Sequence, residues 1–243
     1  MRTIRVFVAE PLAVGVTVSL GEQAAGHVAR VLRLKAGDAV QLFNGDGQQY
    51  AGELVQVDKK AVRARIDAAE RVNRESPLRI TLMQGISRGE RMDYTVQKAV
   101  ELGVTRIEPV ISERCGVSVD ADRWEKKREH WQRVVESACE QSGRNVVPVV
   151  APVRKLDIAL SELEAGSLRL MLDPEGKQGL RDLTLGSSVV LLAGPEGGLG
   201  DMDMKYAHAA KFAGLRLGPR ILRTETAAMA ALAGLQVLAG DFN

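Results

Sequence analysis

Short runs of alternating apolar and polar residues occupy the N-terminal part of the chain, and this period of two is typical of half-buried β-strands. We expect four such strands, at Thr3–Val8, Ala39–Phe43, Tyr50–Val57 and Ala61–Ile66. Turn residues at Asn44–Gly47 and Asp58–Lys60 separate the later strands. One helix is expected at Glu22–Leu34, because apolar residues recur there with the helical period. Several short strands with one helix predict a small β-barrel.

The pattern changes after Arg71–Pro77, a polar segment that ends in proline and is typical of a linker. Beyond it, continuous apolar runs alternate with amphipathic helices, which favours an α/β domain on a mainly parallel sheet. The expected strands are Leu78–Ile86, Val104–Ile111, Leu168–Leu172 and Val189–Ala193, and the expected helices run from Gly89 to Gly103, from Trp124 to Gly143 and over Ala227–Leu238. We therefore predict two domains, at residues 1–72 and 73–243.

Two glycine-containing turns near the C-terminus each follow an apolar run. The first is Gly194–Gly198, and the second lies within Leu217–Thr226. Glycine lets main-chain N–H and C=O groups approach a ligand that side chains would otherwise block. The carboxyl ends of strands are also where α/β sheets bind ligands. These turns predict a cradle for a flat, polar small molecule, although a plain strand-to-helix turn also fits the first of them.

Composition and motifs exclude several classes of function. Apolar residues make up 45% and charged residues 26% of the 243 residues, which is ordinary for a globular protein. No apolar run reaches the roughly 18 residues of a membrane span, and no signal-peptide core is present, so we expect a cytoplasmic protein with no membrane partner. The three histidines and two cysteines are scattered, which predicts no metal site. The fingerprints of a dinucleotide site, a phosphate-binding P-loop and a serine-nucleophile elbow are missing from the sequence.

Arginines stand at several positions that suit contacts with an anionic partner. Arg223 follows a buried-type apolar pair in the second glycine turn, which favours a ligand or substrate role over a salt-bridged surface position. Five further arginines are candidates for phosphate contacts, with solvated charge as the alternative for each: Arg30, Arg33, Arg88, Arg91 and Arg144. Trp124 and Trp131 share one helical face, which is more typical of a core or a dimer interface than of base stacking.

Several segments resemble, in order along the chain, those of the knotted (SPOUT-class) RNA methyltransferases. Within that class the resemblance is to the RsmE family, which methylates N3 of a uridine in 16S ribosomal RNA. The matching segments are Ser87–Asp93, Gln97–Val104, Ser112–Gly116, Ala138–Arg144, the Gly194 turn and Leu217–Thr226. The last two together are highly specific.

The resemblance implies an N-terminal PUA-like β-barrel that binds RNA and a C-terminal α/β domain with a deep trefoil knot. It also implies a homodimer, a small-ribosomal-subunit substrate and S-adenosylmethionine bound in the knot. The residues that it assigns to the cofactor are Leu172, Gly194, Pro195, Glu196, Gly197, Gly198, Leu217, Gly218, Ile221, Leu222, Arg223, Thr226 and Ala227. One departure is Gly200–Asp203, where relatives tend to carry Ser-x-x-Glu, so Asp201 is expected to cap the next helix.

Methylation of uracil N3 requires loss of the N3 proton and in-line approach to the methyl donor. We expect Arg223 and Arg114 to stabilise the developing uracil anion, and Glu196 to accept the proton. Two alternatives remain at this point: a knotted methyltransferase that acts on another RNA or another atom, and a non-catalytic RNA-binding assembly factor.

Overall fold

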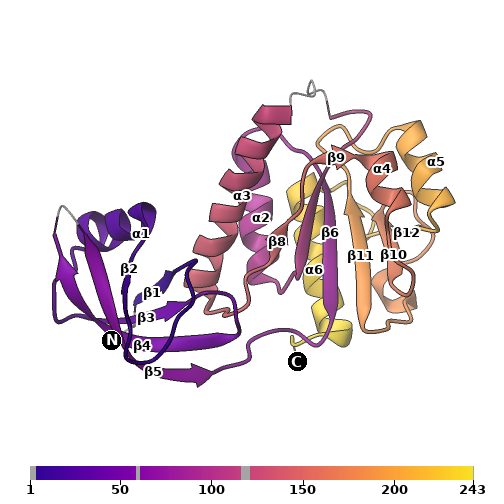
Figure 1. Ribbon diagram of the computed structural model, residues 1–243. Helices are drawn as coiled ribbons and strands as arrows, with labels where there is room; N and C mark the ends of the chain where they lie inside the picture. Colours follow the sequence, from indigo (N-terminus) through magenta and orange to yellow (C-terminus); the bar gives the residue numbers. More distant parts are fainter. Residues whose placement is uncertain (1–3, 59–60, 116–120, 243) are drawn as a thin grey trace. The chain divides into compact units, whose positions relative to one another are not determined.

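The chain divides into two compact units. Figure 1 shows the computed structural model as a ribbon coloured along the sequence. The structure describes residues 4–58, 61–115 and 121–242. The N-terminal unit comprises the residues up to Glu75 together with Cys139–Val147, and the C-terminal unit comprises Ser76–Ala138 together with the residues from Pro148 onward. The end of a long helix and the segment after it therefore belong to the N-terminal unit, although they lie far along the chain.

The N-terminal unit is built on a five-stranded sheet in the order β1-β3-β4-β5-β2. Its strands are β1 (Ile4–Phe7), β2 (Thr17–Ser19), β3 (Ala39–Phe43), β4 (Gln48–Val57) and β5 (Val62–Arg71). β1 pairs with β3 in parallel, and the other neighbours are antiparallel. Alternate residues of β5 are buried, as Val62, Ala64 and Ile66 are, so that one face of the strand packs on the core.

The helical segment of this unit differs from the prediction. It consists of α1 (Glu22–Gly26) followed by a π-helical turn, η1 (His27–Val31), and does not continue to Leu34. Arg33 adopts a φ of 55°, which is incompatible with a right-handed helix. The structure also contains β2, which was not predicted because three residues give too short a pattern. Two residues of the predicted Asp58–Lys60 turn lie outside the described residues.

The C-terminal unit is built on a seven-stranded sheet whose neighbouring strands are all parallel. The order is β12-β10-β11-β6-β7-β8, and β9 also pairs with β7. The strands are β6 (Arg79–Gly85), β7 (Arg106–Ile111), β8 (Val149–Val150), β9 (Arg154–Lys155), β10 (Leu168–Leu172), β11 (Ser188–Ala193) and β12 (Ala213–Leu215).

Helices cover both faces of this sheet, as a buried parallel sheet requires. The helices are α2 (Glu90–Glu101), α3 (Ala121–Ser142), α4 (Leu156–Ser161), the 3₁₀-helix η2 (Leu180–Asp182), α5 (Asp201–Ala209) and α6 (Thr224–Ala239). Met83 of β6 packs in a core cluster with side chains of α4 and α5. The next residue, Gln84, points to the opposite face, where it donates a hydrogen bond to Thr224 at the start of α6. α6 contacts α2 and β11 on that face.

Two features of the C-terminal unit follow from this order. The chain leaves β12 at the edge of the sheet beside β10 and continues into α6, which contacts β11. The loops after β6, β10, β11 and β12 all meet at the carboxyl edge of the sheet.

Across the part of the chain that the structure describes, none of the helices combines the length and the apolar character needed to cross a membrane.

Candidate active site

A cavity of about 840 Å³ opens in the C-terminal unit at the carboxyl ends of three neighbouring strands, β10, β11 and β12. The loop after each strand supplies part of the wall. The lining residues are Arg91, Arg114, Leu172–Glu175, Ala193–Leu199, Asp201, Met204, Leu215, Leu217, Gly218, Arg220–Glu225 and Ala227. Both glycine turns singled out from the sequence therefore border the same cavity.

The conformation of these turns depends on glycine. Gly198 and Gly218 have φ values of 71° and 80°, in the left-handed region that side chains disfavour. The N–H of Gly198 donates to the carbonyl of Pro195 at 2.9 Å and closes the first turn. A Cβ atom added at Gly194 would stand 2.9 Å from the backbone nitrogen of Leu199. The first turn is thus folded tightly enough to expose main-chain groups rather than side chains to the cavity.

A buried amide ties the two turns together. The Nε2 of Gln84 donates to the carbonyl of Gly194 at 3.3 Å and to the Oγ1 of Thr224 at 3.1 Å. Thr224 in turn donates to the same Gly194 carbonyl at 2.5 Å. Sequence reasoning did not single out Gln84. Gln84 could have been found in the sequence as a polar residue inside an otherwise apolar strand. Buried polar side chains in native proteins are almost always hydrogen-bonded.

Several charged side chains line the cavity beside this main-chain wall. Four of them are arginines, namely Arg91, Arg114, Arg220 and Arg223. The Nη1 of Arg114 donates to the carbonyl of Gly197 at 3.2 Å, which holds its guanidinium against the first turn. Arg223 is exposed and occupies the position just before α6. The predicted pair Arg114 and Arg223 is therefore brought to one cavity from opposite parts of the sequence.

Glu196 is the acidic residue of the first turn, and its carboxylate is already engaged. Its Oε1 accepts the main-chain N–H of Arg88 at 2.9 Å and the Nη1 of Arg91 at 3.1 Å. Burial opposes ionisation of this carboxyl, but hydrogen bonds from backbone N–H groups and the Arg91 guanidinium outweigh burial and lower its pKa. A carboxylate with a lowered pKa is a weaker base, so this arrangement disfavours Glu196 as the proton acceptor.

Every residue predicted to bind the cofactor lines this cavity except Thr226, which is exposed in the first turn of α6.

The helix that follows the Gly194–Gly198 turn begins differently from the prediction. The prediction that Asp201 caps α5 is wrong: the helix begins after Gly200, and the carboxylate of Asp203 accepts the Gly200 N–H at 2.8 Å. Asp203 therefore performs the capping role that the Ser-x-x-Glu pattern provides through glutamate.

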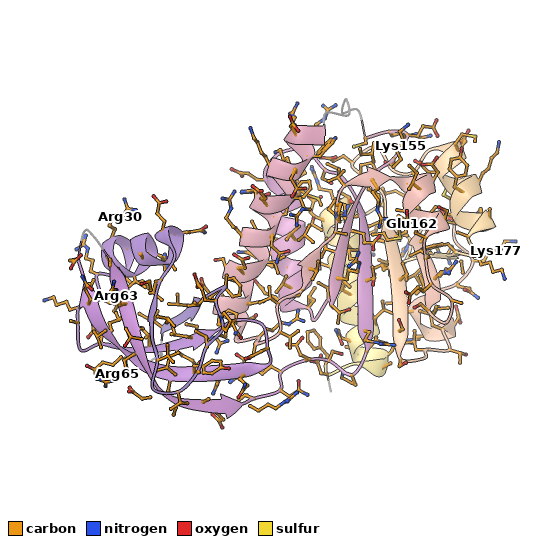
Figure 2. All side chains as sticks on the ribbon, in the orientation of Figure 1. Arg30, Arg63, Arg65, Lys155, Glu162 and Lys177 are labelled. Atoms are coloured by element: carbon orange, nitrogen blue, oxygen red, sulfur yellow. The ribbon has the colours of Figure 1, made fainter. Side chains whose placement is uncertain are left out.

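The predicted RNA-contacting arginines divide into two kinds. Arg30, Arg33, Arg88 and Arg91 are exposed, and Figure 2 shows Arg30 on the helical segment of the N-terminal unit. Arg144 is only 4% exposed, and its guanidinium forms an ion pair with Glu75 inside the N-terminal unit. The prediction for Arg144 is therefore corrected: its donors hold the unit together, because leaving such a charge buried and unpaired would be costly.

Comparisons with known proteins agree with this fold. The family model described as RNA methyltransferase domain matches residues 74–236, and the model described as RNA methyltransferase PUA domain matches residues 20–67. Ribosomal RNA small subunit methyltransferase E of Buchnera aphidicola is 32% identical over 243 residues, covering 100% of this chain and 99% of that protein.

Two solved structures are similar over their full length. One is a Legionella pneumophila protein, described as a methyltransferase and determined with S-adenosylmethionine bound. It is 42% identical, with 100% of both chains covered and a TM-score of 0.95. The other is ribosomal RNA small subunit methyltransferase E of Neisseria gonorrhoeae, bound to S-adenosylmethionine. It is also 42% identical, with 100% of both chains covered and a TM-score of 0.92.

The matched domains define the class as RNA methyltransferases that carry a PUA domain. Within this class the chain belongs to the family of ribosomal RNA small subunit methyltransferase E. The predicted family is confirmed, and so is the predicted fold class, an α/β unit on a parallel sheet preceded by a PUA-like β unit. S-adenosylmethionine, the predicted cofactor, is the molecule that both solved relatives bind.

Proposed function

We propose that this chain transfers a methyl group from S-adenosylmethionine to N3 of one uridine in 16S ribosomal RNA. The observation that carries the proposal is the 840 Å³ cavity bordered by both glycine turns, with arginines beside main-chain donors and acceptors. Its volume lies within the roughly 300–1,000 Å³ typical of small-molecule sites. The substrate class is supported by the small-subunit RNA methyltransferases to which the chain is similar.

The residues that line the cavity fit S-adenosylmethionine chemically. Leu172, Leu217 and Leu222 would offer apolar side chains to the cofactor, and the main chain of Gly194–Gly198 would offer it hydrogen-bonding groups. The carboxylate of Asp173 also lines the cavity and suits a cationic ligand. When bound, the cofactor supplies an electrophilic methyl group on a positively charged sulfur.

Arg223 and Arg114 act on the substrate base in this proposal. Deprotonation of uracil N3 spreads negative charge onto the neighbouring carbonyl oxygens, and guanidinium groups stabilise such charge where water is partly excluded. Arg114 is held by its hydrogen bond to Gly197, while the backbone of Arg223 is placed by its position just before α6. We assign Glu196 to positioning Arg91 and the Arg88 backbone, since its lowered pKa makes it a poor base.

The substrate in this proposal is the assembled small ribosomal subunit rather than a free strand, because a chain that carries both a PUA-like unit and a catalytic unit suits recognition of folded RNA by shape. We further propose that the protein works as a homodimer and in the cytoplasm, where its ribosomal substrate is assembled. The same proposal divides the chain into functional domains at residues 1–72 and 73–243, although the segment Cys139–Val147 packs within the N-terminal unit.

The deciding experiment is methyl transfer from labelled S-adenosylmethionine to small subunits that lack the modification, followed by nucleoside mass spectrometry. A 3-methyluridine product in the ribosomal RNA would support three parts of the proposal: the reaction, the methylated atom and the class of substrate. Methylation of a ribose 2′-hydroxyl, or transfer only to another RNA, would replace it with a different methyltransferase activity. RNA binding without cofactor binding would replace it with a non-catalytic assembly factor, and light scattering tests the dimer.

A further inference from the structure

A second, smaller cavity of about 270 Å³ lies in the C-terminal unit, outside the site described above. One wall is the connection from β6 to α2, and the other is one face of the first half of α3 (Figure 1). The lining residues are Ile86, Ser87, Arg88, Gly89, Met92, Arg123, Trp124, Lys127 and Trp131. The four residues from α3 are spaced so that they share one face of the helix.

Two residues that line this cavity each carry a buried polar group without a hydrogen-bond partner among the described residues. These groups are the hydroxyl Oγ of Ser87 and the indole Nε1–H of Trp124. Ser87 is 5% exposed and Trp124 is 6% exposed. An unpaired buried donor or acceptor is costly, and native proteins keep few of them. A ligand that enters the cavity with its own donor and acceptor would satisfy both groups.

The charge of the cavity is of one sign. Arg88, Arg123 and Lys127 are exposed cations at its rim, and its lining contains no acidic residue. The interior is apolar and aromatic, since Ile86, Met92 and the two indoles contribute to its walls. Cations around an aromatic recess, with polar groups inside, match the chemistry of a nucleotide: a phosphate outside and a planar base within.

The cavity is also next to the site of the proposed reaction. The main-chain N–H of Arg88 donates to Glu196, a lining residue of the large cavity, while Arg88 itself borders the small one. The volume of 270 Å³ is below the roughly 300–1,000 Å³ of a site for a whole drug-sized ligand, so it suits a single base rather than a second cofactor.

We propose that this cavity receives one unstacked base of the substrate RNA, from a nucleotide that neighbours the methylated uridine. Trp124 and Trp131 contact the base in the recess, Ser87 and the Trp124 indole N–H hydrogen-bond its edge, and Arg123 and Lys127 contact phosphates. The identity of the RNA in this inference rests on the proposed function. Binding of a base in the cavity does not, because it needs no methyl transfer.

The sequence offers a direct readout, because Trp124 and Trp131 are the only two tryptophans in the chain. Intrinsic tryptophan fluorescence therefore reports on this cavity alone. We expect titration with a single-stranded RNA decamer of mixed sequence to give saturable quenching, since base contact with aromatic rings is tolerant of sequence. Saturating the protein with S-adenosylmethionine beforehand should leave that quenching in place.

Two substitutions separate a ligand site from a structural cluster. Lys127→Gln should lower the slope of log affinity against log salt by about 0.7, the value for one phosphate contact on a single strand. The matched control is Lys126→Gln, the adjacent exposed lysine of α3, which does not line the cavity and should leave the slope unchanged. Ser87→Ala should weaken RNA binding by about two- to tenfold, as for loss of one hydrogen bond. It should leave the thermal midpoint of the free protein unchanged or higher, because the hydroxyl has no partner to lose.

The results distinguish this inference from the proposed function. Quenching that depends on Lys127 supports the base pocket even if small subunits are not methylated. Absence of saturable quenching overturns it even if methylation is normal. An equal salt dependence of RNA affinity in the Lys127→Gln and Lys126→Gln variants would also contradict it. A change of oligomeric state in Lys127→Gln would contradict it too, because the cavity would then be part of a protein interface.

Discussion

The sheets of the two units are buried in different ways, and the difference determines where each unit can meet a ligand. In β5 of the N-terminal unit, Arg63 and Arg65 alternate with buried residues and point to solvent (Figure 2). In β11 of the C-terminal unit, the run Val189–Ala193 is buried throughout. A sheet covered on one face leaves side chains free for contacts along its strands, whereas a sheet covered on both faces opens only at its strand ends.

This comparison assigns different tasks to the two units. The carboxyl edge of the C-terminal sheet holds the large cavity in which we propose that the cofactor binds and the reaction occurs. The N-terminal unit presents exposed arginines, among them Arg30 in its helical segment and Arg33 just after it, and these offer positive charge to a partner. Changes in the first region should therefore alter turnover and cofactor binding, while changes in the second should alter only RNA affinity and its salt dependence.

The largest effect is expected for Arg223→Ala in the cavity of the C-terminal unit. Loss of one positioned donor to a developing anion typically costs about 10²–10³-fold in rate. Single-turnover methyl transfer to small subunits, measured at a saturating concentration of S-adenosylmethionine, should fall by that factor. Arg216→Ala removes an exposed arginine that follows β12 and does not line the cavity, and it should retain the wild-type rate. Full turnover in Arg223→Ala would remove this residue from the proposed mechanism.

The second prediction tests whether main-chain packing shapes the large cavity. A Cβ added at Gly85 would stand 2.5 Å from the backbone nitrogen of Pro195, so Gly85→Ala must displace the first turn. Overpacking of this kind costs about 1–3 kcal/mol in unfolding free energy. We expect affinity for S-adenosylmethionine to fall at least about tenfold, which corresponds to about 1.4 kcal/mol.

Gly186→Ala is the matched control, because a Cβ there meets nothing within 4 Å. Denaturant unfolding and calorimetric titration measure both variants. If Gly85→Ala bound the cofactor as tightly as Gly186→Ala, the first turn would be more adaptable than its contacts indicate.

The third prediction concerns the N-terminal unit. Replacing Arg30 and Arg33 by glutamine should lower the slope of log RNA affinity against log salt by about 0.7–0.9 for each arginine. Affinity for S-adenosylmethionine should stay unchanged. Arg65→Gln is the control, since the Nε of Arg65 already pairs with Asp67 at 2.8 Å. A loss of turnover at saturating RNA in the double variant would contradict the division of tasks between the units.

The smallest effect is expected for Glu196→Gln and depends on pH. Because the folded protein lowers the pKa of Glu196, its ionised carboxylate stabilises the fold above the ordinary carboxyl pKa, and this contribution disappears as pH falls through the lowered value. The partly exposed pair with Arg91 contributes less than about 1 kcal/mol. The thermal midpoints of wild type and variant should therefore differ slightly at neutral pH and converge in acid.

Glu175→Gln provides the control for Glu196, as it removes an exposed carboxylate from the same cavity. A proton acceptor contributes about 10²–10⁴-fold to a rate. A rate loss of that size in Glu196→Gln alone would restore Glu196 as the base and overrule the argument from its pKa.

Local patterns were sufficient for most elements of the fold. The strands Ala39–Phe43 and Leu168–Leu172 have the predicted bounds, and Gly103 and Gly143, at which two helices were predicted to end, both have left-handed φ values. The two-residue strands β8 and β9 were missed because two residues carry no period. Arg144 was misassigned for a different reason: its place beside the helix end resembles a surface position until its partner, Glu75, is known.

The sequence by itself determined most of the longer elements, the two glycine turns and the family, because each depends on residues within a short segment or on motifs read in order. Only the tertiary structure decided the strand order β12-β10-β11-β6 and therefore which loops meet. It also joined Gln84 to Thr224, which are 140 residues apart, and surrounded the two tryptophans with cations. Burial and pairing of this kind are set by residues distant along the chain, and no local period records which of them will be neighbours.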